Sequence, residues 1–358
     1  MDTLVEKVDC IFEKYLEADF FAGGVCSIRQ NGQPIFLKAY GEKNSLEKQA
    51  MKTDTIFDLA SVTKLFTSTQ ILQMISRKAL KLDTTLAECL PFAGEYDKLA
   101  DVTVEQLLTH SSGLAAWHPL YSIFSSIEEL RNGLKEIELF HKEDQEVVYS
   151  DMNYILLGEI LKEYHQADLQ TIIRKELVSP MGLKNLSFGP ILKENIAATE
   201  FGNRIEMEMC RTRGRVFSGW RPMNKPIIGE VNDGNAFYFF EGQSGHAGLF
   251  GTAEDAALLA DLYLADGKVN GEKLINPELV QQALLERVGN RCLGWHTGLS
   301  FPQGVGHTGF TGTSIWIVPE LQLNVVLLTN RLHVKEPKDI YPFREELHNE
   351  ILSAIRPS

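Results

Sequence analysis

The chain has 358 residues, 44% of them hydrophobic and 23% charged, which is ordinary for a globular protein with a sizeable core. Its 35 Lys and Arg against 48 Asp and Glu give a net charge of −13, which argues against nucleic acid or an anionic membrane surface as the main partner. Five scattered cysteines without a CxxC pair favour a reducing compartment. The opening residues lack the apolar core of a secretory signal and no stretch is apolar enough to cross a membrane, so we expect a cytoplasmic protein, with a periplasmic protein trimmed of its signal as the alternative.

The predicted elements start with a helix and a hairpin. Apolar residues recur at helical spacing over residues 4–16, which indicates an amphipathic helix. Two strand-like runs, 24–30 and 34–40, are separated by Asn31-Gly32, a strong signal for a tight hairpin turn. From about 61 to 210 the pattern is mainly helical, with one helix predicted over 153–165.

The second half of the chain returns to strands. Residues 200–245 are rich in Gly, Asn and Arg and are predicted to be irregular, after which Thr252 begins an apolar helix over 256–265. Strands are predicted over 314–318 and 323–329, and a last helix over 342–355.

This order predicts an α+β fold with an antiparallel sheet flanked by N- and C-terminal helices. We expect residues 1–60 and 211–358 to form this sheet domain, split in sequence, and residues 61–210 to form a mainly helical domain inserted in it. Ligands commonly bind between domains, so the active site is expected in the cleft between the two.

The segment Ser61-Val62-Thr63-Lys64 is the first candidate for chemistry. Three residues apart on a helix, Ser61 and Lys64 share one face, and a serine in the first turn lies near the N–H groups and the positive end of the helix dipole. A serine hydroxyl needs a base to become a nucleophile, and lysine can be that base only if its pKa falls well below about 10.4. A second S-x-x-K, from Ser45 to Lys48, lies in a polar stretch with no apolar helix behind it.

Two further motifs follow in the chain. Tyr149-Ser150-Asp151 enters the helix predicted over 153–165, where a tyrosine beside a cationic lysine can relay a proton as base and then as acid, or simply anchor the loop. The segment 306–310, Gly-His-Thr-Gly-Phe, enters a strand through glycines and can supply a backbone N–H to an oxyanion hole. An earlier His-Thr-Gly, at 296–298, lacks this glycine-rich entry.

These three motifs in this order resemble the serine β-lactamase and penicillin-binding-protein superfamily, whose marks are S-x-x-K, Y-x-N and K-T-G or H-T-G. The long separation between Ser61 and Tyr149 suits the branch of class C β-lactamases, D,D-carboxypeptidases and related esterases. Other phrases match the same branch at 107–114, 180–183, 245–250 and 328–331. The resemblance covers residues 20–335.

The resemblance implies a serine hydrolase that works through an acyl-enzyme without a cofactor or metal. Ser61 would be the nucleophile, Lys64 and Tyr149 would move protons, and the backbone N–H groups of Ser61 and Phe310 would form the oxyanion hole. The expected substrate-binding residues are Asp151, Asn153, His307, Thr308, Gly309 and His246, the last because its flanking glycines allow close backbone approach.

Two departures from the family pattern bear on the substrate. Asp151 stands where class C β-lactamases have Asn, and a carboxylate there would raise the pKa of Lys64 rather than lower it. His307 replaces the lysine of K-T-G and is only partly charged near neutral pH. Both changes indicate a shift away from β-lactams, towards small esters or amides, or towards D-amino-acid peptides.

Four functions therefore compete. The first is a small-molecule esterase or amidase, the second a D-amino-acid or D,D-peptidase, the third a weak β-lactamase, and the fourth a non-catalytic penicillin-binding sensor. Partners are expected to be a small ester, amide or D-peptide. Among the remaining candidates, His110 is expected to hold a loop, Trp117 and Trp220 either wall the cleft or pack in the core, and the run Arg211–Arg221 is either solvated or holds a substrate carboxylate.

Overall fold

The computed structural model describes residues 2–134, 139–140, 146–298 and 300–356. Its central element is an antiparallel sheet of seven strands in the order β3-β2-β1-β12-β11-β10-β9. The strand bounds are β1 Gly23–Gln30, β2 Gln33–Asn44, β3 Gln49–Ala50, β9 His296–Gly298, β10 Phe301–Thr308, β11 Thr313–Val318 and β12 Leu323–Thr329. Because β1 pairs with β12, the first and last strands of the chain are neighbours in the middle of this sheet.

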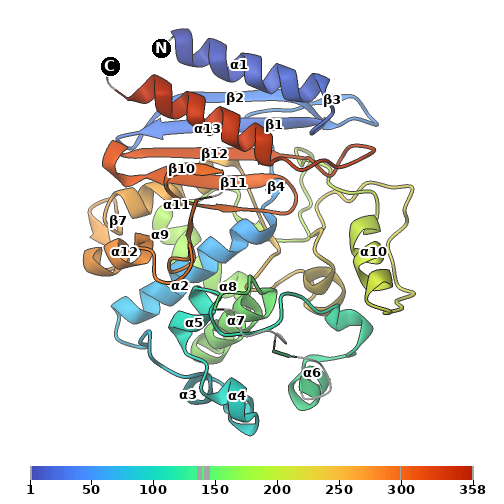
Figure 1. The fold of residues 1–358 in the computed structure, drawn as a ribbon, viewed down its shortest axis with the longest axis vertical. Coiled ribbons are helices and arrows are strands. Elements are labelled where there is room, and N and C mark those ends of the chain that lie inside the picture. The colour runs from blue at the N-terminus through green and yellow to red at the C-terminus, as the bar shows by residue number, and fades with distance from the viewer. Residues whose placement is uncertain (1, 135–138, 141–145, 299, 357–358) are drawn as a thin grey trace.

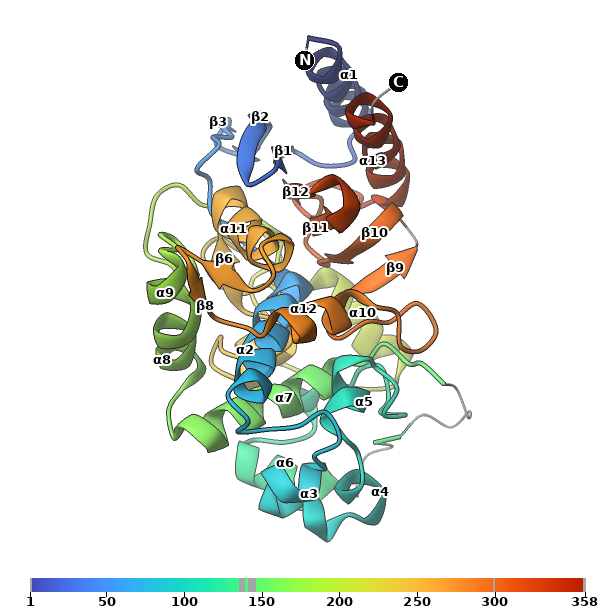
Figure 2. The same cartoon turned by 90° about the vertical axis from the view of Figure 1, so that its left-hand side faces the viewer.

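Helices from both ends of the chain cover one face of the sheet. Helix α1 (Asp2–Glu17) and helix α13 (Tyr341–Ile355) lie side by side on it (Figures 1 and 2). Phe12 of α1 stacks on Tyr40 of β2 at 4.0 Å and meets Phe343 of α13 edge-on at 5.0 Å. The other face packs on helix α11 (Ala253–Leu264), which Thr252 and Asp255 begin as a capping box. The predicted α+β fold with flanking terminal helices is confirmed.

The hairpin between β1 and β2 also forms as predicted. Asn31 and Gly32 both adopt positive φ, +52° and +71°, as the tight turn between twisted strands requires.

The helical part lies below the sheet in Figure 1. Its helices are α2 Thr63–Ser76, α3 Leu86–Cys89, α4 Asp97–Ala100, α5 Val104–Leu108, α6 Ile127–Gly133, α7 Asp151–His165, α8 Leu169–Ile173 and α9 Ser179–Met181. Helix α2 is buried along almost its whole length and packs against α7, so both the start of α2 and the start of α7 are held rigidly. Among the described residues, no helix combines the length and the apolar character needed to cross a membrane.

The strands of the large sheet all come from residues 1–60 and 211–358, in keeping with the division that we predicted. A smaller sheet, β4 (Phe57–Asp58), β6 (Leu249–Gly251) and β5 (Ser187–Phe188), joins both parts of the chain, and its strand β5 falls within 61–210. The division into two domains stays a prediction. After α11 come β7 Lys268–Val269, β8 Glu272–Lys273 and α12 Pro277–Leu284.

Residues 200–245 are more regular than predicted. They contain helix α10 (Arg204–Thr212) and a π-helical turn, Asn235–Phe239. The two are joined by Glu206 of α10, which accepts a hydrogen bond from the backbone N–H of Gly234 at 2.8 Å. This tertiary contact is not visible in the local pattern, which is why the segment reads as irregular from sequence.

Candidate active site

A strained turn presents Ser61 at the start of α2. Ala60 adopts a positive φ of +47°, and Ser61 follows it in a 3-10 turn, Ala60–Val62, that leads into the helix. The turn is held by the buried carboxylate of Asp58, which accepts from the backbone N–H groups of Ala60 at 2.8 Å and Asn232 at 2.6 Å. A non-glycine residue in the left-handed region costs free energy, and the Asp58 bonds oppose that cost.

Lys64 is fully buried and lies next to Ser61. Its Nζ donates to Ser61 Oγ at 2.9 Å, to Asp151 Oδ1 at 2.8 Å and to the backbone oxygen of His246 at 3.2 Å. Burial alone would lower the pKa of Lys64, but the charge of Asp151 and the neighbouring Tyr149 outweigh it and raise the pKa above its usual value. Lys64 therefore stays an ammonium ion at neutral pH, as the carboxylate at position 151 led us to expect.

Tyr149 precedes α7 and faces the same ammonium group. Lys64 Nζ lies 5.0 Å from the centroid of the Tyr149 ring, and the ring of His110 lies 4.5 Å away. The structure thus brings Ser61, Lys64 and Tyr149 together around one point, although they are far apart in sequence.

Asn153 and His110 form a support behind Tyr149. Asn153 Nδ2 and the backbone N–H of Ser150 both donate to His110 Nδ1, at 3.0 and 3.1 Å, while Ser112 Oγ donates to Asn153 Oδ1 at 2.5 Å. The side chains of His110, Asn153 and Ser112 together hold the loop before α7, which agrees with the structural role expected for His110. Asn153 is fully buried in this network, and its expected contact with substrate stays a prediction.

The third motif lies against the turn that holds Ser61. Thr311 Oγ1 donates to the backbone oxygen of Asp58 at 2.8 Å, and Thr313 Oγ1 donates to that of Leu59 at 2.9 Å. A Cβ at Gly309 would lie 2.7 Å from the Leu59 oxygen and 2.1 Å from Thr313 Oγ1, so only glycine fits. This close approach brings the backbone of Phe310 beside the Ser61 turn, as an oxyanion hole requires.

His307 lies at the buried end of β10. Its Nδ1 donates to the backbone oxygen of Thr308 at 2.9 Å. Burial, reinforced by the nearby charges of Lys64 and Arg291, lowers the pKa of His307 well below its usual value, so the ring is neutral. The earlier His-Thr-Gly forms the edge strand β9, where His296 pairs with Gly306 of β10.

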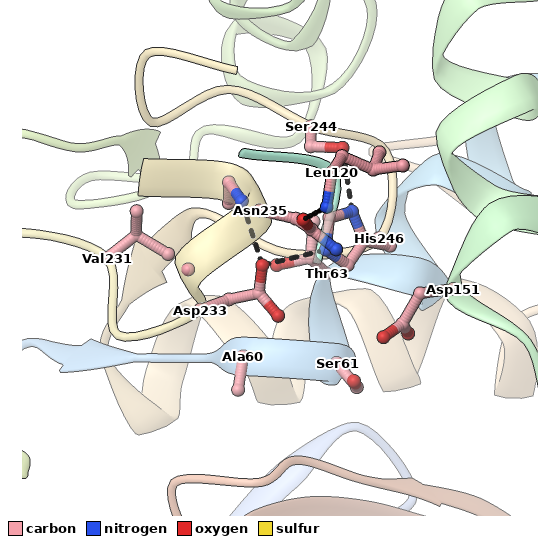
Figure 3. Close-up of polar contacts among 12 residues, drawn as sticks. Ala60, Ser61, Thr63, Leu120, Asp151, Val231, Asp233, Asn235, Ser244 and His246 are labelled. Carbon is pink, nitrogen blue, oxygen red and sulfur yellow. Dashed lines mark hydrogen bonds and ion pairs between the residues drawn. The ribbon is translucent and has the colours of Figure 1, made fainter. Parts of the chain in front are cut away.

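His246 contacts Lys64 through its backbone oxygen, and its side chain binds Asp233. Its Nε2 donates to Asp233 Oδ1 at 2.9 Å and its Nδ1 accepts from Ser244 Oγ at 2.7 Å. Figure 3 shows that the carboxylates of Asp233 and Asp151 lie on either side of Ser61, with His246 above them in this view. Asp233 lines the cavity and accepts from His246, while the contact of His246 with substrate stays a prediction.

Asp151, Asp233 and His246 are close enough to suggest a metal site, since their ligand atoms lie within 4.8 Å of one another. Each is already engaged, however. Asp151 accepts from the Lys64 ammonium and Asp233 accepts from His246 Nε2, so a cation would have to compete with both. We interpret the cluster as part of the proton and charge network around Ser61.

A cavity of about 360 Å³ opens at Ser61. Its wall includes Tyr149, Asp151, Thr308, Gly309, Phe310, Trp117 and five further charged residues, Glu200, Glu206, Asp233, Arg331 and Arg344, with Asp339 beside them. Sequence reasoning missed these six charged residues, because tertiary folding alone brings them to the cavity. Arg331 ends the phrase matched at 328–331, which is the one signal that could have found it.

The run Arg211–Arg221 has other partners. Arg211 forms an exposed ion pair with Glu208, Arg213 lies 5.1 Å from the centroid of the Trp117 ring, and Arg221 lies 3.4 Å from that of Phe237. Among the described residues, Arg331 and Arg344 line the cavity.

The class of protein follows from this fold and site and from comparison with known proteins. A family model described as Beta-lactamase matches residues 8–348, so the chain belongs to the beta-lactamase family. It is a serine hydrolase of that family, of the kind that acts through an acyl-enzyme.

Among its relatives, an N-acetylmuramyl-L-alanine amidase of Bacillus subtilis is 30% identical over 92% of this chain and 81% of its own length. A putative D-alanyl-D-alanine carboxypeptidase of Escherichia coli is 30% identical over 86% and 77%. Among solved structures, the hydrolase EstCE1 has a TM-score of 0.75 at 20% identity, covering 97% of this chain and 99% of its own. A class C beta lactamase from Rhodobacter sphaeroides has a TM-score of 0.73 at 19% identity over 97% and 99%. At these identities the two structures show the fold.

Proposed function

We propose that this enzyme hydrolyses an amide bond in a small peptide-like substrate, with Ser61 as the nucleophile. The observation that carries the proposal is the contact of Ser61 Oγ with Lys64 Nζ at 2.9 Å, in a cavity that Tyr149 also lines. The two relatives at 30% identity support an amide substrate, because their names describe an amidase and a carboxypeptidase.

The proposed reaction assigns one step to each group. Tyr149 takes the proton of Ser61 Oγ as this oxygen attacks the carbonyl carbon, and the backbone N–H groups of Ser61 and Phe310 stabilise the oxyanion. The C–N bond then breaks, and Tyr149 returns its proton to the leaving nitrogen. A water molecule releases the acid from Ser61 by the same steps in reverse. Lys64 remains charged throughout and stabilises the negative oxygen of Ser61.

The charges of the cavity support a peptide-like substrate. Arg331 donates to the backbone oxygen of Phe310 and Arg344 to that of Thr313, and Asp339 lines the cavity with them. Asp233, which accepts from His246, also lines the cavity. A short peptide carries both a carboxylate and an amine, and the cavity offers charged groups of both signs.

We also propose that the enzyme works in the cytoplasm. All five cysteines are free, and three of them, Cys26, Cys210 and Cys292, are buried as thiols. Free thiols persist in a reducing compartment. Cell fractionation followed by detection of the native protein tests this placement.

The central experiment measures intact mass after reaction with a fluorophosphonate, for wild type and Ser61→Ala. Wild type should gain one adduct and Ser61→Ala none, because the phosphonate bonds to Ser61 Oγ as fluoride leaves. Turnover is then compared for a muramyl-L-alanine amide, a D-Ala-D-Ala peptide, p-nitrophenyl acetate and penicillin. Faster Ser61-dependent turnover of one of the two amides supports the proposal. Turnover of the ester alone, or of penicillin alone, overturns its substrate, and the absence of any adduct overturns its nucleophile.

A further inference from the structure

The buried carboxylate of Asp58 joins the Ser61 turn to a wall of the cavity. Its Oδ1 accepts from the backbone N–H of Ala60 at 2.8 Å, and its Oδ2 accepts from that of Asn232 at 2.6 Å. Ala60 directly precedes Ser61, while Asn232 and its neighbour Asp233 line the cavity (Figure 3). One carboxylate therefore sets the spacing between the nucleophile and the segment that carries Asp233.

The backbone of Asp58 is fixed by two further contacts. Its backbone oxygen accepts from Thr311 Oγ1 at 2.8 Å, and Thr311 directly follows Phe310 of the proposed oxyanion hole. In the small sheet, Asp58 of β4 pairs with Phe250 of β6. Asp58 thus contacts three parts of the site: the nucleophile turn, the cavity wall and the segment of the oxyanion hole.

The negative charge of Asp58 costs folding stability. Burial raises the pKa of Asp58 to about 6, against the two backbone hydrogen bonds, which lower it. The unfolded carboxyl titrates near pH 4, as an approximate value, so above pH 6 the folded protein holds a charge that the unfolded chain carries more favourably. A buried charge that is kept beside a nucleophile, at a cost in stability, indicates a role in the reaction rather than in folding.

The charges around Asp58 do not neutralise it by direct contact. Among the residues that the structure describes, no cation lies at ion-pair distance from Asp58. Asp233 raises the pKa of Asp58, and Arg221, whose Nη2 donates to the backbone oxygen of Val231, lowers it. The other charged or titratable groups on the neighbouring segments are engaged or neutral: Lys64 pairs with Asp151, His246 donates to Asp233, Glu230 lies 3.9 Å from Arg221, Glu200 accepts from Asn232 Nδ2, and His307 is neutral because burial lowers its pKa.

We propose that the charge of Asp58 positions Ser61 for attack, by holding the strained turn against the cavity wall, so that loss of this charge slows acylation. The inference rests on the proposed role of Ser61. A carboxylate binds both N–H groups more strongly than a protonated carboxyl does, because charge-assisted hydrogen bonds are about twice as strong as neutral ones. Without them, the positive φ of Ala60 is less well opposed and the turn relaxes. Asp58 acts through the turn.

The test measures the rate of Ser61 phosphonylation by a fluorophosphonate from pH 5 to pH 8, for wild type and Asp58→Asn. The amide keeps the shape of the carboxyl without its charge. At pH 7.5 we expect Asp58→Asn to react at least tenfold more slowly, because small displacements of a reacting group have large effects on rate. At pH 5 about nine in ten Asp58 carboxyls of wild type carry a proton, so the ratio of the two rates should shrink by about five- to tenfold.

The ratio isolates Asp58 because any other group that titrates in this range affects both proteins alike. Asp54→Asn is the matched control. It removes an exposed carboxylate four residues earlier, which accepts from Asn195 Nδ2, and its profile should match wild type.

A merely structural role gives a different result. A ratio between wild type and Asp58→Asn that is the same at every pH would overturn the inference, and so would equal rates at pH 7.5. Should Asp58→Asn fail to fold, wild type alone decides the question. The backbone amide signals of Ala60 and Asn232 in NMR spectra should titrate together near pH 6, with the midpoint of the phosphonylation rate, and signals that stay constant from pH 5 to pH 8 would show the inference to be wrong. Absence of any adduct on wild type would instead contradict the role of Ser61, which keeps the two failures apart.

Discussion

At the scale of single residues, the charge of Lys64 depends on Asp151. Their 2.8 Å ion pair is enclosed, with Lys64 wholly buried, and this carboxylate raises the pKa of Lys64 against the effect of burial. A Lys64 that stays charged cannot remove the proton of Ser61, which is why the proposed mechanism assigns that step to Tyr149.

The variant Asp151→Asn tests whether the charge of Lys64 depends on this carboxylate. The amide no longer stabilises the ammonium, so the pKa of Lys64 should fall, and the alkaline limb of the Ser61 phosphonylation profile should move to lower pH. Glu163→Gln, which removes an exposed carboxylate from the same helix, should leave the profile unchanged. An alkaline limb that stays in place in Asp151→Asn would mean that the charge of Lys64 does not matter to the reaction.

At the scale of elements, the turn between β10 and β11 fixes the distance between Ser61 and the oxyanion hole. We expect Gly309→Ala to reduce the phosphonylation rate about 100-fold or more, because its Cβ would overlap the Leu59 oxygen and Thr313 Oγ1 and push the strand away. Gly298→Ala, in the earlier His-Thr-Gly, meets open space. It should lose only about 1–2 kcal/mol of stability, because of its positive φ, and keep its rate. Equal rates in the two variants would contradict the argument.

Helix α13 carries a histidine that makes stability depend on pH. His348 Nδ1 donates to the backbone oxygen of Ser300 at 2.7 Å, its ring lies 4.5 Å from that of Trp316, and burial lowers its pKa to about 3. The unfolded chain binds this proton near pH 6.5 and the folded chain does not. The stability that it contributes is therefore complete above pH 6.5 and is lost as the pH falls towards 3.

His348→Gln keeps a donor for Ser300 but cannot titrate. Between pH 7.5 and pH 5.0, wild type should lose about 2 kcal/mol more unfolding free energy than the variant, as urea denaturation at the two pH values measures. Between pH 7.5 and 8.5 the difference between the two proteins should stay constant. If both lose the same free energy on acidification, His348 titrates normally in the folded state.

At the scale of the whole molecule, the sequence predicts what depends on local pattern. The Asn31-Gly32 turn, the capping box at Thr252 and the alternation of the late strands each contain their own signal, and together they predict a sheet closed by both chain ends. Ser61, Lys64 and Tyr149 were predicted as a catalytic set because their motifs keep a fixed order. Their meeting at one point follows from the packing of α2 on α7, which no local pattern shows.

The parts that sequence reasoning missed depend on long-range contacts. Asp233 and Glu206 reach the cavity from a segment predicted to be irregular, because the bond between Glu206 and Gly234 orders it. Arg344 lies on a helix that was predicted correctly, but only tertiary packing decides which of its side chains reach the cavity. Asn153 and His246 were predicted to bind substrate from their place in the motifs, and their burial in hydrogen-bond networks is a tertiary feature that adjacency in sequence does not show.

The two ends of the chain pack together on one sheet, and this packing leads to a last prediction about stability. Phe12 and Phe343 are fully buried and meet edge-on at 5.0 Å, although they come from opposite ends of the chain. Phe12→Leu and Phe343→Leu should each cost about 1–2 kcal/mol in urea denaturation, and the double variant should cost less than their sum, because each substitution already removes the shared contact. Lys14→Ala breaks an exposed ion pair between the same two helices and should cost under about 1 kcal/mol. Strictly additive losses would show that the Phe12–Phe343 contact does not couple the two chain ends. A loss from Lys14→Ala larger than about 1 kcal/mol would show that the exposed ion pair between α1 and α13 matters as much as their buried aromatic contact.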